Sequence, residues 1–172
     1  MTHRTMLVLG GAASGKSAWA ESWVKARNLP KIYVATAAAG DTEMAQKIAK
    51  HRVQRGPDWE TLEIPHALAD TLRTLPPGRA VLIDCASMWL SNLMLRGDDL
   101  DQATQTFVTA LAACPADVTI VTNEVGQGIV PDNALARRFR EAQGRLNIQL
   151  AQQATRVVQI VAGLPNVLKG DI

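Results

Sequence analysis

The chain has 172 residues, of which 47% are hydrophobic and 20% charged, and its formal net charge is +2. This length is typical of one domain with a sizeable core, so we expect a single domain over residues 1–172. So small a net charge does not favour nucleic-acid binding, and two cysteines indicate neither a disulfide framework nor a metal site. The absence of a signal-peptide pattern and of any apolar run near roughly 20 residues predicts a cytoplasmic protein without a membrane span.

The first predicted strand, residues 6–9, leads into a glycine-rich loop and then a predicted helix over about residues 16–27. The pattern G-x-x-x-x-G-K-S between a strand and a helix is typical of a loop that binds phosphates. Glycine lets backbone N–H groups approach a polyphosphate closely, and the helix N-terminus adds positive potential. The sequence therefore predicts a nucleoside triphosphate site, with candidate contacts at Gly10, Gly11, Ala12, Ala13, Ser14, Gly15, Lys16 and Ser17.

Three side chains of this predicted site have expected chemical roles. We expect Lys16 to act in catalysis by contacting the β- and γ-phosphates, and the Ser17 hydroxyl to bind Mg²⁺. The apolar run 80–84 predicts a buried strand that ends in Asp84. Ligands of open α/β sheets bind at the carboxyl ends of the strands, so we expect Asp84 to share the Mg²⁺ with Ser17. A cap on the following helix is the alternative role for Asp84.

Further strands are predicted over residues 31–36, 59–64, 117–122 and 157–161, and helices over about 41–55 and 133–154. Alternating strands and helices predict an α/β fold, with a mostly parallel sheet and helices on both faces, as in P-loop NTPases. Trp19 and Trp23 lie four residues apart on the first predicted helix. We expect them to pack against a neighbouring element or subunit rather than a ligand.

The predicted helix over residues 41–55 has an apolar stripe that ends in His51 and Arg55. With Lys50 and Arg52 beside them, these residues form a basic end that could receive phosphate oxygens. A single histidine is more often structural. In a nucleotide-binding protein, however, His51 is also a candidate phosphate contact or nucleophile, because a neutral imidazole can attack an α-phosphate and form a covalent intermediate.

The segment 122–131, TNEVGQGIVP, follows a predicted buried strand, and its glycines permit a close approach to a ligand. Glu124 and Gly126 stand where the guanine-reading loop of switch GTPases has Lys and Asp, so a GTPase switch is not favoured. An ordinary connection between a strand and a helix is the alternative for this segment. A cluster of arginines follows, which we interpret as local anion handling: Arg137, Arg138, Arg140 and Arg145.

Together these motifs resemble the bifunctional adenosylcobinamide kinase and adenosylcobinamide-phosphate guanylyltransferase family of cobalamin biosynthesis. The resemblance covers nearly the whole chain, including the phosphate loop, the residues around His51, and the strand that ends in Asp84. The phosphate loop alone is generic, whereas the block over residues 122–147 is specific to this family. Two positions depart from it, because some relatives have Arg in place of Ala13 and many have Glu in place of Asp84.

The resemblance implies a two-step enzyme that phosphorylates adenosylcobinamide with ATP or GTP and then transfers GMP from GTP. In the family a histidine that matches His51 carries the guanylyl group, and the subunits assemble as a homotrimer. The resemblance also implies a corrinoid substrate, beside the Mg²⁺ expected from the phosphate loop and the absence of a nucleic-acid partner expected from the small net charge. Beyond the phosphate loop, it implies nucleotide contacts at Ala35, Thr36, Ala37, Arg52, Val53, Gln54, Arg55, Glu63 and Asp84.

Two other functions stay open from the sequence. A monofunctional P-loop small-molecule kinase would use the same phosphate loop, would keep His51 as a structural residue and would form no covalent adduct. A non-catalytic regulatory module would bind nucleotide tightly with negligible turnover and would not bind a corrinoid.

Overall fold

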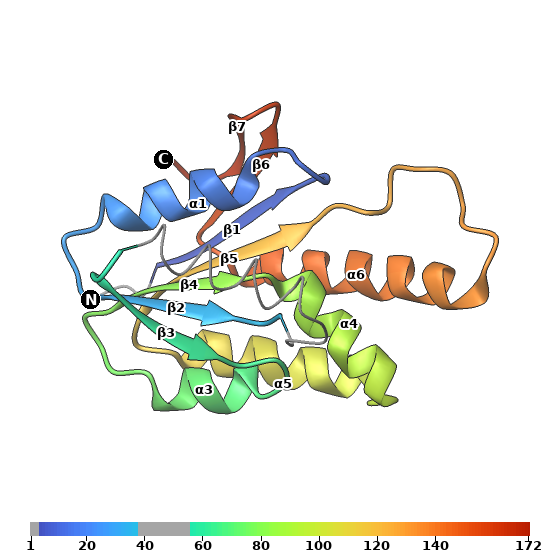
Figure 1. Cartoon of the computed structure of the whole chain (residues 1–172), viewed down its shortest axis with the longest axis horizontal. Helices are drawn as coiled ribbons and strands as arrows, with labels where there is room; N and C mark the ends of the chain where they lie inside the picture. The colour runs from blue at the N-terminus through green and yellow to red at the C-terminus, as the bar shows by residue number, and fades with distance from the viewer. Residues whose placement is uncertain (1–3, 38–55) are drawn as a thin grey trace.

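A single seven-stranded sheet organises the computed structural model, which describes residues 4–37 and 56–172 (Figure 1). The strand order is β3-β2-β4-β5-β1-β6-β7. All neighbouring strands are parallel except β7, which pairs antiparallel with β6. The strands are β1 (Thr5–Gly10), β2 (Lys31–Ala35), β3 (Trp59–Glu63), β4 (Ala80–Asp84), β5 (Asp117–Asn123), β6 (Arg156–Val161) and β7 (Leu164–Lys169).

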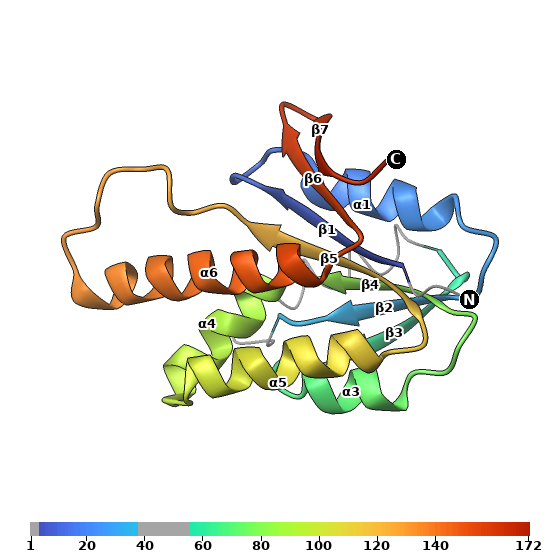
Figure 2. The ribbon, with the colours of Figure 1, turned by 180° about the vertical axis from the view of Figure 1, so that it is seen from behind.

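Helices cover both faces of this sheet (Figures 1 and 2). Helix α1 (Lys16–Lys25) packs on one face, against β1, β4, β5 and β6. The opposite face carries α3 (Leu68–Thr74), α4 (Ala86–Arg96), α5 (Leu100–Ala113) and α6 (Ala134–Gln153). This arrangement confirms the predicted α/β fold with a mostly parallel sheet. No helix in the described ranges is long and apolar enough to cross a membrane.

The two faces of the sheet contribute to two separate hydrophobic clusters. Successive side chains of a strand point to opposite faces. In β4, Val81 and Ile83 accordingly join the large cluster under α3–α6, whereas Leu82 joins the smaller cluster under α1. These three side chains are almost completely buried. Burial on both faces explains why the central strands are continuous apolar runs in the sequence.

Most predicted elements lie within two residues of the observed ones. The predicted strand 80–84 coincides with β4, and the predicted helix 133–154 corresponds to α6. The sequence analysis missed α3, α4, α5 and β7, and the predicted helix over residues 41–55 lies outside the described residues.

Trp19 and Trp23 on α1 stack on one another, with ring centroids 5.7 Å apart and planes 10° from parallel. The Arg27 guanidinium lies 4.8 Å from the centroid of the Trp23 ring, within the range of a cation–π contact. Both tryptophans also pack at the margin of the cluster under α1. Their contacts are therefore structural in this chain, as expected.

Candidate functional site

The phosphate loop connects β1 to α1 through a compact turn. The Ser14 N–H donates to the Gly11 carbonyl at 3.3 Å, and Gly15 precedes α1 with a φ of 89°. Glycine adopts this left-handed backbone without a steric penalty, and the Gly15 carbonyl accepts from the Trp19 N–H at 3.0 Å. The first N–H groups of α1 thus lie directly after the loop, where a helix N-terminus favours an anion.

The hairpin between β6 and β7 supports this loop from behind. The Gly163 N–H donates to the Ser14 carbonyl at 2.8 Å. A Cβ atom on Gly15 would lie 3.2 Å from the Gly163 Cα, and one on Gly10 would lie 2.7 Å from the Ile160 carbonyl oxygen. The backbone of the hairpin therefore approaches the loop too closely for larger side chains, which explains the glycines at both ends of the motif.

Lys16 is the first residue of α1, and its side chain folds back over the loop. Its ammonium group donates to the Gly11 carbonyl at 3.0 Å. The positive charge consequently lies beside the same backbone groups that the sequence analysis assigns to phosphate binding. This position suits a lysine that contacts a polyphosphate.

Asp84 at the end of β4 receives hydrogen bonds from two neighbouring elements. The Ser17 hydroxyl on α1 donates to Asp84 Oδ1 at 3.4 Å, and the Tyr33 hydroxyl on β2 donates to Asp84 Oδ2. The structure thus brings together Ser17 and Asp84, which are 67 residues apart. The sequence analysis assigned no role to Tyr33, although a phenol in a buried strand was a signal for a specific hydrogen bond.

The donor atoms at this position fit Mg²⁺. A hydroxyl and a carboxylate are hard oxygen ligands, and Mg²⁺ is commonly bound by one or two protein oxygens together with substrate phosphates and water. Within residues 4–37 and 56–172, no group of three or more His, Cys, Asp or Glu side chains could hold a metal ion. Ser17 and Asp84 are accordingly suited to share a cation with a bound nucleotide.

The remaining predicted nucleotide contacts occupy the carboxyl ends of β2 and β3, or lie outside the described residues. Ala35, Thr36 and Ala37 end and follow β2, and the exposed Glu63 is the register partner of Ala35. The Thr36 hydroxyl is fully buried, donates to the Cys85 carbonyl and accepts from the Cys85 N–H, both at 2.7 Å. His51, Arg52, Val53, Gln54 and Arg55 lie outside the described residues.

The segment after β5 begins beside the phosphate loop, since the Glu124 N–H donates to the Gly10 carbonyl at 3.0 Å. It then extends away from the sheet before α6 begins (Figure 1). Arg140 donates to the carbonyls of Gly126 and Ile129, and Arg137 donates to those of residues 131 and 132. These two arginines hold the segment in place.

A buried polar network fixes the start of this segment against α6. The Thr122 hydroxyl donates to Asn147 Oδ1, and Gln143 Nε2 donates to the same oxygen, both at 2.8 Å. Asn147 Nδ2 donates to the Asn123 carbonyl at 3.0 Å, and the Asn123 N–H donates to the Ser87 hydroxyl at 2.8 Å. Because buried polar groups require partners, this network positions the carboxyl end of β5 next to the phosphate loop.

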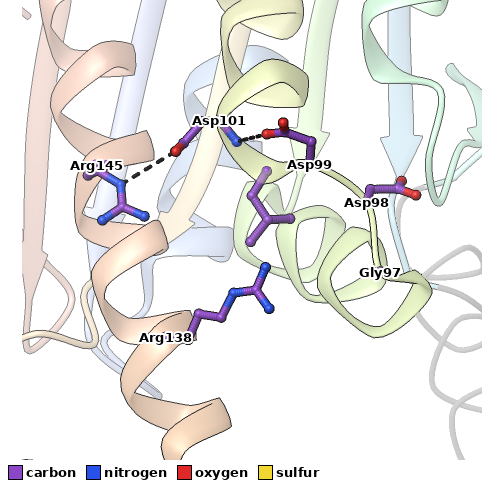
Figure 3. A pocket seen from close by; sticks show the side chains of 7 residues that line it. Gly97, Asp98, Asp99, Asp101, Arg138 and Arg145 are labelled. Carbon is purple, nitrogen blue, oxygen red and sulfur yellow. Dashed lines mark hydrogen bonds and ion pairs between the residues drawn. The ribbon is translucent and has the colours of Figure 1, made fainter.

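Away from the phosphate loop, a pocket of about 440 Å³ lies between the α4–α5 turn and α6 (Figure 3). Its acidic side chains and Arg145 already have structural partners: Asp98 pairs with Arg96, Asp99 caps α5, and Arg145 forms an ion pair with Asp101 at 3.5 Å. None of the candidate nucleotide-binding residues that the structure describes lines it. Its lining consists of Gly97, Asp98, Asp99, Leu100, Asp101, Arg138 and Arg145.

Cys85 follows Asp84 directly, but its environment does not favour nucleophilic chemistry. Burial raises the pKa of the Cys85 thiol, and the neighbouring Asp84 carboxylate raises it further. A thiol with a raised pKa stays protonated near neutral pH, and the protonated form is a poor nucleophile. Burial also raises the pKa of the Cys114 thiol, and both cysteines are free.

Comparison with known proteins identifies similar chains. The family model described as cobinamide kinase / cobinamide phosphate guanyltransferase matches residues 6–168. The bifunctional adenosylcobalamin biosynthesis protein CobP of Pseudomonas aeruginosa is 45% identical, over 96% of this chain and 97% of its own. The corresponding CobU protein of Salmonella typhimurium is 40% identical, over 92% and 96%. The flagellar accessory protein FlaH from Methanocaldococcus jannaschii has a similar fold, with a TM-score of 0.52 at 13% identity, over 98% of this chain and 79% of its own.

Proposed function

Because the chain belongs to the cobinamide kinase / cobinamide phosphate guanyltransferase family, we propose that it catalyses two successive transfers to a corrinoid. In the first, the hydroxyl group of adenosylcobinamide receives a phosphoryl group from ATP or GTP. In the second, the resulting phosphate receives GMP from GTP, which yields adenosylcobinamide-GDP. The structural observation that supports this proposal is the phosphate loop, next to which the Ser17 hydroxyl donates to the Asp84 carboxylate.

The kinase step requires neutralised charge and correct positioning more than covalent chemistry. The corrinoid hydroxyl oxygen attacks the γ-phosphorus and gives its proton to solvent, the bond to the β,γ-bridging oxygen breaks, and the nucleoside diphosphate leaves. Lys16 and the backbone N–H groups of residues 10–17 hold the phosphate oxygens through this change. Ser17 and Asp84 would hold Mg²⁺, which when bound withdraws charge from the phosphates.

The guanylyl step uses His51 as the nucleophile. Its neutral imidazole nitrogen attacks the α-phosphorus of GTP, the bond to the bridging oxygen breaks, and pyrophosphate leaves. A phosphate oxygen of adenosylcobinamide phosphate then attacks the guanylyl phosphorus and releases His51. Further nucleotide contacts are proposed at Ala35, Thr36, Ala37, Arg52, Val53, Gln54, Arg55 and Glu63, and the strand ends that carry four of them lie at the same edge of the sheet as the phosphate loop.

The working form is proposed to be a homotrimer in the cytoplasm, where the nucleoside triphosphates are supplied. An unpaired sheet edge with exposed apolar residues supports self-association, since β7 is the outermost strand and Leu164 and Leu168 are 70% and 55% exposed. Light scattering should give a mass three times the 18.5 kDa of one chain. A monomer mass at micromolar concentration would contradict this part of the proposal.

The proposal is tested by following the corrinoid itself. Purified protein is incubated with adenosylcobinamide, Mg²⁺ and GTP, and the corrinoid products are separated and weighed by mass spectrometry. We expect a phosphorylated product first and a product that carries GDP later. A phosphorylated product alone would support a simple kinase, and an unchanged corrinoid with bound nucleotide would support a regulatory module.

A further inference from the structure

We propose that Tyr33 is a positioning residue that sets the orientation of the Asp84 carboxylate for the metal–nucleotide complex. The inference rests on the proposed function, because it assigns a purpose to a contact of the proposed Mg²⁺ ligand. Tyr33 opens the segment 33–36, which is part of the family resemblance, but the sequence assigns it no role. It comes from β2, whereas Asp84 ends β4 and Ser17 belongs to α1.

The Tyr33 side chain is itself held firmly. Only 7% of its surface is exposed, and it belongs to the hydrophobic cluster under α1. Its ring meets the edge of the Trp59 ring, with centroids 6.1 Å apart and planes at 82°. A buried phenol with a fixed ring can present its hydroxyl in only one direction, and here that direction is Asp84 Oδ2.

The two oxygens of Asp84 consequently face different partners. Oδ2 accepts from the Tyr33 hydroxyl, while Oδ1 accepts from the Ser17 hydroxyl at 3.4 Å. The 3.4 Å contact lies near the upper limit for a hydrogen bond between hydroxyl and carboxylate, so it contributes little to the orientation of the carboxylate. Tyr33 is therefore the group that turns Oδ1 toward Ser17, the second proposed ligand of the cation.

Hydrogen bonds from Thr36, the residue directly after β2, also hold the main chain at Asp84. The Thr36 N–H donates to the Asp84 carbonyl at 3.2 Å, and the Thr36 hydroxyl bridges the carbonyl and N–H of Cys85. Tyr33 in β2 thus fixes the side chain of Asp84, and Thr36, directly after β2, fixes the main chain of residues 84 and 85. Partners of this kind, which orient a metal ligand, typically change metal affinity by about 10–100-fold when removed.

The test uses Tyr33→Phe, which removes only the hydroxyl. Affinity for a non-hydrolysable GTP analogue is measured by calorimetry in EDTA and again at saturating Mg²⁺. We expect the affinity in EDTA to stay within about twofold of wild type, because the phosphate loop is untouched. The gain in affinity that Mg²⁺ produces should fall by about tenfold.

Two further variants separate positioning from a general loss of structure. In Asp84→Asn, which removes the charged ligand, an added Tyr33→Phe should have little further effect on the Mg²⁺-dependent gain. Thr61→Val changes the register partner of Tyr33 on β3 and should bind like wild type. The melting temperature of each variant is recorded with the same preparations.

The outcomes are distinct. A Tyr33→Phe variant with an undiminished Mg²⁺-dependent gain overturns the inference, as does one that loses affinity equally in EDTA and in Mg²⁺. Equal effects of Tyr33→Phe in the wild-type and Asp84→Asn backgrounds also overturn it, since the phenol would then act elsewhere. A wild-type protein with no affinity for the analogue under either condition overturns the proposed function itself, and the inference with it.

Discussion

At the scale of single residues, Gly10 shows why the phosphate loop tolerates so little change. A Cβ atom there would lie 2.5 Å from the Ser14 hydroxyl oxygen, which can rotate away, but also 2.7 Å from the Ile160 carbonyl oxygen, which cannot. Relief therefore requires a shift of β6 or of the loop. Forcing an extra carbon into such a contact typically costs about 1–3 kcal/mol.

Gly10→Ala is accordingly expected to lower the free energy of unfolding by about 1–3 kcal/mol. Gly11→Ala is the matched control, because no atom of the described residues, apart from its two chain neighbours, lies within 4 Å of a Cβ at that position. Urea denaturation followed by circular dichroism measures both. Equal stability of the two variants would contradict the close approach between Gly10 and β6.

Lys16 is the residue through which the phosphate loop acts on both proposed reactions. Lys16→Ala should lower the rates of the kinase and guanylyl steps by about 100-fold or more, since each loses charge stabilisation of its phosphates. Lys25→Ala on the same helix is the control: its ion pair with Glu21 lies on the surface. Single-turnover assays of each step provide the measurement. Normal kinase turnover in Lys16→Ala would refute the use of one phosphate loop by both reactions.

At the scale of elements, the connection from β5 to α6 depends on buried amide groups. Asn147 accepts from Thr122 and Gln143 and donates to the Asn123 carbonyl. Asn147→Ala removes these three hydrogen bonds and should lower the free energy of unfolding by about 2 kcal/mol, although Gln143 still donates to the Thr122 hydroxyl. Ile148→Ala, at an adjacent position that is 60% exposed, should change it by less than about 0.5 kcal/mol.

Denaturant unfolding of both variants tests this contribution. If Asn147→Ala proves as stable as Ile148→Ala, the network does not hold the two elements together. A fully folded Asn147→Ala variant with weakened nucleotide affinity would instead extend the role of the network to the neighbouring phosphate loop, because Glu124 donates directly to Gly10.

The turn between α4 and α5 has an acid-sensitive ion pair. Hydrogen bonds from Arg96 lower the pKa of the Asp98 carboxyl below its ordinary value. A folded-state pKa below the unfolded one stabilises the fold above the unfolded value, and this stabilisation is lost as the pH falls through the folded value. Wild type should therefore melt above Asp98→Asn at pH 6, and the difference should shrink as the pH falls through the folded-state pKa. A difference that grows as the pH falls would contradict this pairing.

The helices around this turn also show what the sequence analysis overlooked. Gly97 ends α4 in a left-handed conformation, and the Asp99 side chain caps α5 by accepting from the N–H groups of Asp101 and Gln102. Both are recognisable signals of a helix end and a helix start. The pattern around residues 86–113 could therefore have predicted both helices, whereas the uniformly exposed β7 offers no alternation of buried and exposed positions.

At the scale of the whole molecule, strand order decides what sequence alone can predict. The phosphate loop and Asp84 were predictable because each follows a buried strand in a recognisable pattern. The contact between Tyr33 and Asp84 was not, since it requires β2 to lie beside β4, and the intervening β3 lies on the outer side of β2. The support of the phosphate loop by the β6–β7 hairpin likewise depends on a contact between distant parts of the chain.

The same order places the candidate residues at one edge of the molecule. Strands β1, β2, β3 and β4 are parallel within the sheet, so their carboxyl ends carry the phosphate loop, Thr36, Glu63 and Asp84 at a common edge. Open α/β sheets bind ligands at this edge. The proposed two-step chemistry adds one demand, a nucleophile that can accept a guanylyl group, and His51 is the residue proposed to meet it.

The central claim is therefore tested most directly by the covalent step. Pure protein is incubated with Mg²⁺ and GTP labelled at the α-phosphate, and the denatured chain is examined for bound label, with His51→Ala in parallel. We predict acid-labile label on the wild-type chain and none on His51→Ala. A folded wild-type protein that binds GTP and acquires no label would contradict the guanylyl-histidine mechanism.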